Sequence, residues 1–298
     1  MSSLVIMIIF IISILLAIPV SISLGIASVL PGAFDPSFTA SGQFVIRSMV
    51  GGIDSFPLIA VPMFVLSGII MARGGISEKI FDVFSLLFGR FPAGIPCSVV
   101  ATCMFFGAIS GSGPATVAAV GSMTIPVLTA LGYDRKFSTA IVAVAGGIGV
   151  IIPPSIPFIM YAMASGQSVS SLFIAGIMPG LLISLLIMIY CILYCIRNGE
   201  DRTLIDKRIQ ELHDRGISSV IRDSLSALMA PVIVLGCIYA GITSPTEAAV
   251  ISVFYSVAVS MLVYRSLRAS DMKEIISEAI RTFTPILFIL AASMAFSR

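Results

Sequence analysis

Two apolar segments, residues 105–126 and 143–157, are interrupted near their centres by Gly, Ser and Pro and contain no charged residue. Helices that cross a membrane are normally unbroken, because lipid offers no partner for free backbone N–H and C=O groups. A break is tolerated where these groups face protein or a hydrated cavity, and secondary transporters build their substrate and ion sites from such breaks. The two segments therefore predict a transport site.

The first break is SGSGPAT, residues 110–116. Its glycines permit a tight reversal of the chain, and Pro114 suits the first turn of a helix that follows. Free N–H groups at the start of that helix favour an anion, whereas the three hydroxyl side chains and nearby carbonyls favour a hard cation such as Na⁺. The alternative is a broken helix that only packs against its neighbours. The candidate ligands of an ion or substrate are Ser110, Gly111, Ser112, Gly113 and Thr116.

The second break is GGIGVIIPPS, residues 146–155. Two consecutive prolines remove two backbone donors and leave carbonyls one turn earlier without partners. Three glycines loosen the same turn, so we predict an unwound segment between two half-helices, with a simple proline kink as the alternative. A hairpin tip and an unwound helix that meet at mid-membrane would form one site. The candidates in this break are Gly146, Gly147, Gly149, Ile151, Pro153, Pro154 and Ser155.

Composition indicates an integral membrane protein. Of the 298 residues, 58% are hydrophobic and 11% are charged, and the mean hydropathy is +1.10. Soluble domains carry about 25% charged residues. The apolar N-terminal segment lacks a basic region and a cleavage-site pattern, which favours a membrane helix over a removed signal peptide. The five cysteines lie in apolar segments without metal-binding spacing, and no nucleic-acid partner is expected.

The distribution of basic residues predicts the topology. All but two of the 17 Lys and Arg residues lie between apolar spans, in segments 73–90, 135–136, 197–222 and 265–281. These segments can share one side only if residues 93–131 form a re-entrant hairpin, and the positive-inside rule makes that side cytoplasmic. The apolar spans are 3–18, 20–34, 56–72, 93–131, 137–164, 170–196, 224–242, 246–264 and 284–298, of which the first two could be one helix broken at Pro19.

Two shorter patterns predict local structure. Residues 74–90 place apolar side chains on one helical face and Glu78, Lys79 and Asp82 opposite, as in an amphipathic helix at the membrane interface. Residues 244–247, SPTE, have the spacing of a capping box with proline in the first helical turn. A role of Glu247 in binding an ion or a partner is the alternative to this structural role.

An internal repeat organises the chain. The order of short span, proline break, short span, amphipathic segment and span occurs before and after the charged segment 198–223. An odd number of crossings in the first unit would invert the second, as in inverted-repeat transporters. The predicted parts are a first repeat (1–197) with scaffold helices (1–90), a hairpin (93–131), a broken helix (137–164) and a helix (170–196), then a cytoplasmic loop (198–223) and the beginning of a second repeat (224–298).

The chain resembles the large membrane subunit of tripartite ATP-independent periplasmic (TRAP) transporters, within the broader ion transporter superfamily. The resemblance runs from about Leu4 to the end, and five motifs carry it: GGIDSFPLIAVPMFVLSGIIMARGGI, FFGAISGSGPATVAAVGSMTIP, IIPPSIPFIMYAMASG, LFIAGIMPGLL and GITSPTEAAVISVFY. It implies an all-α polytopic protein of the bacterial inner membrane that contains the first half of an inverted-repeat elevator transporter, with a re-entrant hairpin and a broken helix, and the start of the second repeat.

The same resemblance implies a Na⁺-coupled importer of organic acids such as C4-dicarboxylates or sialic acid. Such a subunit works with a small four-helix membrane subunit and a periplasmic substrate-binding protein, and Na⁺ is its coupling ion without another cofactor. One Na⁺ would lie between the hairpin tip, at Ser110 and Ser112, and the broken helix around Gly147 to Pro154.

Two departures from the family pattern leave an alternative open. Many members carry an Ala-Asp pair soon after the first SGS, whereas PAT follows here and supplies no carboxylate. Members are also longer by another hairpin, another broken helix and terminal helices. The alternative is therefore a truncated or split half that does not transport alone and only assembles with other subunits.

An enzymatic function is not expected. A serine nucleophile needs a base within hydrogen-bond reach. The hairpin serines lack a G-x-S-x-G pattern, and the single histidine, His213, falls in a polar segment where we expect it to be solvated.

Overall fold

The computed structural model describes residues 3–34, 42–214 and 216–297, and every element in these ranges is helical. The predicted all-α class is thereby confirmed. The chain divides into two compact units, Met1–Ile59 with Glu278–Arg298, and Ala60–Ser277. Each unit has its own internal packing.

The first unit begins with a pair of helices. Helices α1 (Ser3–Leu15) and α2 (Val20–Phe34) pack side by side and are joined by a turn at residues 16–19. The turn reverses the chain just before Pro19, with Ala17 in the left-handed region (φ 59°). The two spans are therefore separate helices rather than one long helix with a kink. The unit is completed by α3 (Gly42–Ile53), η1 (Phe56–Ile59) and the later part of α14 (Met272–Phe296).

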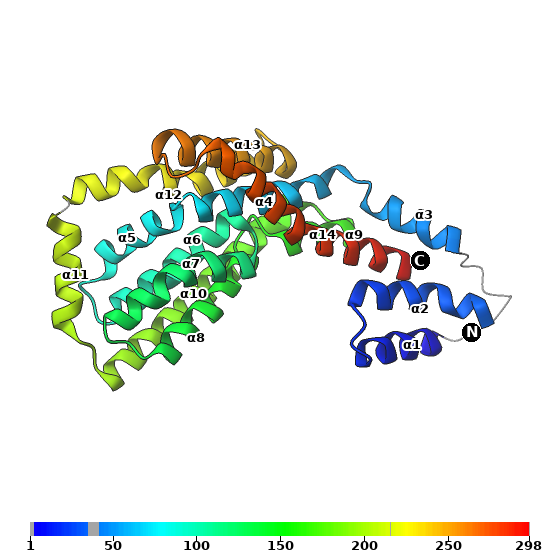
Figure 1. Ribbon diagram of the computed structural model, residues 1–298, viewed down its shortest axis with the longest axis horizontal. Helices are drawn as coiled ribbons and strands as arrows, with labels where there is room; N and C mark the ends of the chain where they lie inside the picture. The colour runs from blue at the N-terminus through cyan, green and yellow to red at the C-terminus, as the bar shows by residue number, and fades with distance from the viewer. Residues whose placement is uncertain (1–2, 35–41, 215, 298) are drawn as a thin grey trace. The chain divides into compact units, whose positions relative to one another are not determined.

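The second unit is built around α6 (Gly94–Ser110). Nearly all of its side chains are buried, because α5, α7, α8 and α10 surround it. A helix that is apolar on every side needs such a central position. Figure 1 shows α6, α7, α8 and α10 running side by side. The bounds of its neighbours are α7 Gly113–Ala130, α8 Arg135–Gly146, η2 Gly147–Val150, α9 Ile156–Ser165 and α10 Val169–Asn198.

The other helices of this unit flank the central group. Helix α4 packs along the length of α13, where the hydroxyls of Ser67 and Ser256 are 2.8 Å apart in a buried contact. Helix α11 runs across the ends of α6, α7 and α10 and leads into α12 (Figure 1). The remaining bounds are α4 Ala60–Arg73, α5 Ile76–Phe88, α11 Arg202–Asp214, α12 Ile217–Tyr239, α13 Pro245–Ala258, the π-helical turn η3 Val259–Val263 and η4 Ala269–Asp271.

Three segments differ from the sequence-based expectation. Residues 198–223, interpreted as a loop, contain α11 and the first turns of α12. The span expected at 284–298 belongs to a longer helix that begins at Met272. Asp82, expected on the polar face of the 74–90 helix, is buried (4% exposed) and pairs with Arg208 at 3.2 Å. For α11 and Asp82 the difference comes from packing against α5, which is distant in sequence.

Within the described residues, six helices are long and apolar enough to cross a membrane. They are Phe56–Arg73, Gly113–Ala130, Val169–Asn198, Ile217–Tyr239, Pro245–Val263 and Ala269–Phe296. The first leg of the hairpin (Gly94–Ser110) and the second half of the broken helix (Ile156–Ser165) are apolar but shorter. With 17 and 10 residues, they lie at and below the lower limit of length for a complete crossing.

Candidate functional site

The hairpin tip is a two-residue turn between α6 and α7. Gly111 ends α6 in the left-handed region (φ 62°), which glycine enters without steric cost. Ser112 is extended and caps α7, with its hydroxyl accepting the N–H of Ala115 at 3.4 Å. The reversal thus lies inside the segment 110–114 where the sequence predicts a tip.

The second break separates α8 from α9. After Gly146 the chain continues as the single 3₁₀ turn η2 and then as an irregular segment until α9 begins at Ile156. Ser155 spans this segment, because its hydroxyl donates to the carbonyl of Val150 (2.6 Å) and accepts the N–H of Phe158 (3.4 Å). The break is therefore an interrupted helix and not a simple proline kink.

The tip and the break lie against each other. The N–H of Ile156 donates to the carbonyl of Gly111 at 3.2 Å, which joins the start of α9 to the turn of the hairpin. A Cβ atom added to Gly107 would lie 2.3 Å from the Cα of Gly149, and one added to Gly111 would lie 2.8 Å from the carbonyl oxygen of Pro154. Backbones approach this closely only where glycine leaves room.

Three oxygens converge beside this contact. The hydroxyl of Thr116 donates to the carbonyl of Ser112 at 2.8 Å, and the Ser110 hydroxyl lies 3.1 Å from that of Thr116 and 3.4 Å from the Ser112 carbonyl. Ser110 and Thr116 are 1% and 0% exposed. Oxygen ligands of a cation the size of Ca²⁺ or Na⁺ lie about 2.3–2.6 Å from it, and so roughly 3.5 Å from one another. A bound cation would spread these three oxygens only slightly.

The ends of four half-helices meet here. Helices α6 and α8 run into the site with their C-termini, which carry partial negative charge, while α7 and α9 start from it with positive N-termini. The sequence has no Asp, Glu, Lys, Arg or His between Arg90 and Asp134, or between Lys136 and Arg197. Backbone dipoles and hydroxyl groups are therefore the polar groups that this region offers to an ion or a charged substrate.

Two of the predicted site residues are not part of the contact. Gly147 is exposed, and a Cβ added there meets nothing within 4 Å. The carbonyl of Ile151 lies 2.6 Å from a Cβ added to Gly176, so this part of the break packs on α10 instead of on the tip. The others lie at the tip or along the break: Ser110, Gly111, Ser112, Gly113, Thr116, Gly146, Gly149, Pro153, Pro154 and Ser155.

Sequence reasoning missed two glycines that shape the site. Gly107 lies inside α6, where glycine lowers helix stability by about 1 kcal/mol relative to alanine. The contact with Gly149 explains why a glycine is needed at this position. Gly68 of α4 lies behind the tip, where an added Cβ would be 2.8 Å from the Cβ of Ser110. An isolated glycine within a helical pattern was the available signal for both.

Comparison with known proteins identifies a family and several relatives of this chain. The family described as "Tripartite ATP-independent periplasmic transporter, DctM component" matches residues 7–298. The chain is 38% identical over 291 residues to the isethionate TRAP transporter permease protein DctMQ of Oleidesulfovibrio alaskensis, which covers 96% of this chain and 44% of that protein.

Two further relatives are similar over most of the chain. The ectoine TRAP transporter large permease protein TeaC of Halomonas elongata is 39% identical over 283 residues, or 93% of this chain and 64% of that protein. The C4-dicarboxylate TRAP transporter large permease protein DctM of Pseudomonas aeruginosa is 36% identical over 250 residues, or 82% of this chain and 56% of that protein. The chain thus spans about half to two thirds of the length of these relatives.

These relatives are permease subunits and not enzymes, as the sequence predicts. The family match covers both breaks and all six long apolar helices. A multi-pass protein of the bacterial inner membrane follows. The chain belongs to the DctM family of large permease subunits of TRAP transporters.

Proposed function

We propose that this chain supplies the first half of the transport unit of a Na⁺-coupled importer of small organic acids. The observation that carries the proposal is the convergence of three oxygens, two of them on buried side chains, with four half-helix ends in a region without charged side chains. The oxygens and the C-termini of α6 and α8 favour a cation. The N-termini of α7 and α9 favour the anionic group of a substrate.

The relatives support the proposed substrate class. They are named for isethionate, ectoine and C4-dicarboxylates, all of which carry a sulfonate or a carboxylate group. A helix N-terminus binds either group through backbone N–H donors. The proposed partners are a small four-helix membrane subunit and a periplasmic substrate-binding protein, and the proposed mechanism is elevator transport with Na⁺ between the tip and the break.

In this proposal Thr116 and Ser110 are the side-chain ligands of Na⁺ and Ser112 contributes its backbone carbonyl. Gly149 leaves the space that Thr116 occupies, because a Cβ there would lie 2.7 Å from the Thr116 hydroxyl. Gly147, at an exposed position without contact to the tip, is the weaker candidate among the sequence-predicted ligands.

The test replaces the threonine hydroxyl by a methyl group of similar size. Thr116→Val, in the permease that contains this chain, should raise the Na⁺ concentration for half-maximal uptake about tenfold, since the variant loses one oxygen ligand of the cation and tenfold corresponds to about 1.4 kcal/mol. Uptake is measured in proteoliposomes together with the small subunit and the binding protein.

The matched control is Thr124→Val on the same helix. Thr124 is equally buried (0% exposed) and its hydroxyl donates to the carbonyl of Val120 at 2.7 Å, away from the tip. A second pair, Ser110→Ala against Ser98→Ala on α6, separates ligand loss from helix effects in the same way. Equal Na⁺ dependence in Thr116→Val and Thr124→Val would contradict the proposed ion site.

A further inference from the structure

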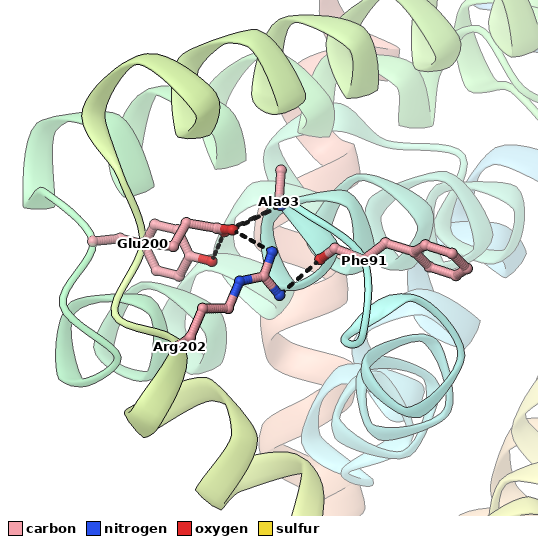
Figure 2. A network of polar contacts seen from close by, with 5 residues as sticks. Phe91, Ala93, Glu200 and Arg202 are labelled. Atoms are coloured by element: carbon pink, nitrogen blue, oxygen red, sulfur yellow. Dashed lines mark hydrogen bonds and ion pairs between the residues drawn. The ribbon is translucent and has the colours of Figure 1, made fainter.

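Glu200 is a buried carboxylate at the end of the hairpin opposite the tip. Its side chain is 6% exposed and lies in the turn between α10 and α11. Glutamate is rarely buried unless it is paired. Here both carboxylate oxygens accept the backbone N–H of Ala93 at 3.1 Å, and the carboxylate is ion-paired with Arg202 at 2.9 Å (Figure 2).

The donors to this carboxylate come from both legs of the hairpin. Ala93 directly precedes α6, adopts the left-handed conformation (φ 56°) and offers no side-chain cap of its own. A carboxylate at a helix N-terminus favours the helix through the dipole and takes the place of the missing cap. Tyr133 follows the end of α7, and its hydroxyl donates to Glu200 at 2.5 Å. One side chain thus joins the beginning of α6 to the end of α7.

The phenol of Tyr133 keeps its proton in this position. Burial raises the pKa of the phenol well above its usual value, and the hydrogen bond to Glu200 raises it further. The phenol therefore donates to Glu200 throughout the physiological pH range.

Arg202 extends the connection to α11. One guanidinium nitrogen pairs with Glu200, and another donates to the carbonyl of Phe91 at 3.4 Å (Figure 2). Farther along α11, Arg208 pairs with the buried Asp82 of α5. Helix α11 is thereby attached to the hairpin base (residues 91–93 and 131–133) at its first turn and to α5 in its middle.

We propose that Glu200 is a positioning residue for the hairpin: by holding both legs at the base, it keeps the tip in register with the broken helix. The legs are continuous helices of 17 and 18 residues, so a shift or rotation at the base is carried along them to Ser110 and Thr116. The effect on ion binding rests on the proposed function, whereas the effect on tip geometry does not.

The first measurement reports geometry without reference to Na⁺. Spin labels are attached at Ala118→Cys on α7 and Tyr161→Cys on α9, both exposed, in a chain whose five native cysteines are replaced. Pulsed electron–electron double resonance then gives the distance distribution between hairpin and broken helix. Glu200→Gln should broaden this distribution, while Glu211→Gln, an equal change of charge at an exposed position of α11, should leave it unchanged.

Tyr133→Phe keeps the aromatic ring and removes a single hydrogen bond, so it tests the same connection if Glu200→Gln folds poorly. It should broaden the distribution less than Glu200→Gln, and the double variant should equal Glu200→Gln alone, because Tyr133 acts through Glu200. Additive broadening, or a distribution for Glu200→Gln that matches Glu211→Gln, would overturn the assignment.

The second measurement is the Na⁺ dependence of uptake in the complete permease. Glu200→Gln should raise the Na⁺ concentration for half-maximal uptake roughly three- to tenfold, the response to about one lost hydrogen bond, with a smaller change in maximal rate. Broadened distances with unchanged Na⁺ dependence in both Glu200→Gln and Thr116→Val would refute the ion site and leave the positioning role intact. Broadened distances with altered Na⁺ dependence only in Thr116→Val would refute the link from the base to the ion site.

Discussion

Two of the glycines where the hairpin touches the broken helix, Gly107 and Gly149, face each other. Gly107 and Gly149 bring α6 and η2 to backbone contact, and the Thr116 hydroxyl occupies the space beside Gly149. Gly147, two residues earlier in the same turn, faces open space. The three residues look alike in the sequence, yet their tolerance of a methyl group should differ sharply.

We expect Gly149→Ala to destabilise the protein by about 1–3 kcal/mol, the usual cost of forcing an extra carbon into a packed site. Its Cβ would lie 2.7 Å from the Thr116 hydroxyl and 3.1 Å from the Cα of Gly107, which is backbone and cannot move aside easily. Gly147→Ala should change stability by less than about 0.5 kcal/mol. Thermal unfolding in detergent measures both, and similar losses in the two variants would contradict the contact.

A second prediction at this scale concerns pH. Hydrogen bonds from the Thr203 hydroxyl and from the N–H groups of Leu204 and Thr203 lower the pKa of Asp201 at the start of α11. A lowered folded-state pKa contributes stability above the unfolded value of about 3.9, and this stability is lost as pH falls through the folded value.

Protection of the first turn of α11 against amide exchange, corrected for the intrinsic rate, should therefore decline below about pH 4. Asp201→Asn should remove the decline, because an amide oxygen caps a helix at every pH. A wild-type decline that persists in Asp201→Asn would assign the effect to another group.

At the scale of elements, the breaks were predictable because their chemistry is local. Glycine in the left-handed region at Gly111, serine caps at Ser112 and Ser155, and the proline pair at 153–154 each act within a few residues of themselves. The same holds for the capping box at Ser244 and Glu247, which the structure confirms. Local rules were sufficient to place the tip and the start of α9.

Helix α11 was not predictable in this way. Its sequence is rich in charge, and only three apolar side chains, Ile205, Ile209 and Leu212, are buried at helical spacing. Their burial depends on packing against α5, which is distant in sequence. Glu200 was missed for the same reason, since its partners at Ala93 and Tyr133 are 107 and 67 residues away.

In the candidate site, too, local features were predictable and features set by helix packing were not. The sequence identified the hydroxyls at Ser110 and Thr116 and the glycines at the break. It did not separate Gly149, which touches the tip, from Gly147, which does not, because both follow the same local pattern. Only the register between two helices distinguishes them, and register is a property of packing.

At the scale of the whole molecule, the orientation in the membrane is the main prediction to test. Single cysteines at Asn198 and Ala269, both exposed, should resist an impermeant thiol reagent added from outside, because both lie in basic segments that the positive-inside rule places in the cytoplasm. Ile242, 73% exposed in the turn before α13, is the control expected to react.

The labelling is done in intact cells and repeated after permeabilisation. Asn198→Cys and Ala269→Cys should then also react. Ready reaction of Asn198→Cys and Ala269→Cys in intact cells would contradict the cytoplasmic placement of these basic segments.

The hydrogen bonds among the tip oxygens have a consequence for the energetics of turnover. Thr116 donates to the carbonyl of Ser112 and Ser110 lies within hydrogen-bond distance of both, so these hydroxyls have partners without an ion. Releasing an ion then leaves no orphaned donor, whose burial would cost about 1–3 kcal/mol. For the Na⁺-coupled carrier proposed above, this would allow the empty site to return without substrate, and so would favour one-way accumulation over obligatory exchange.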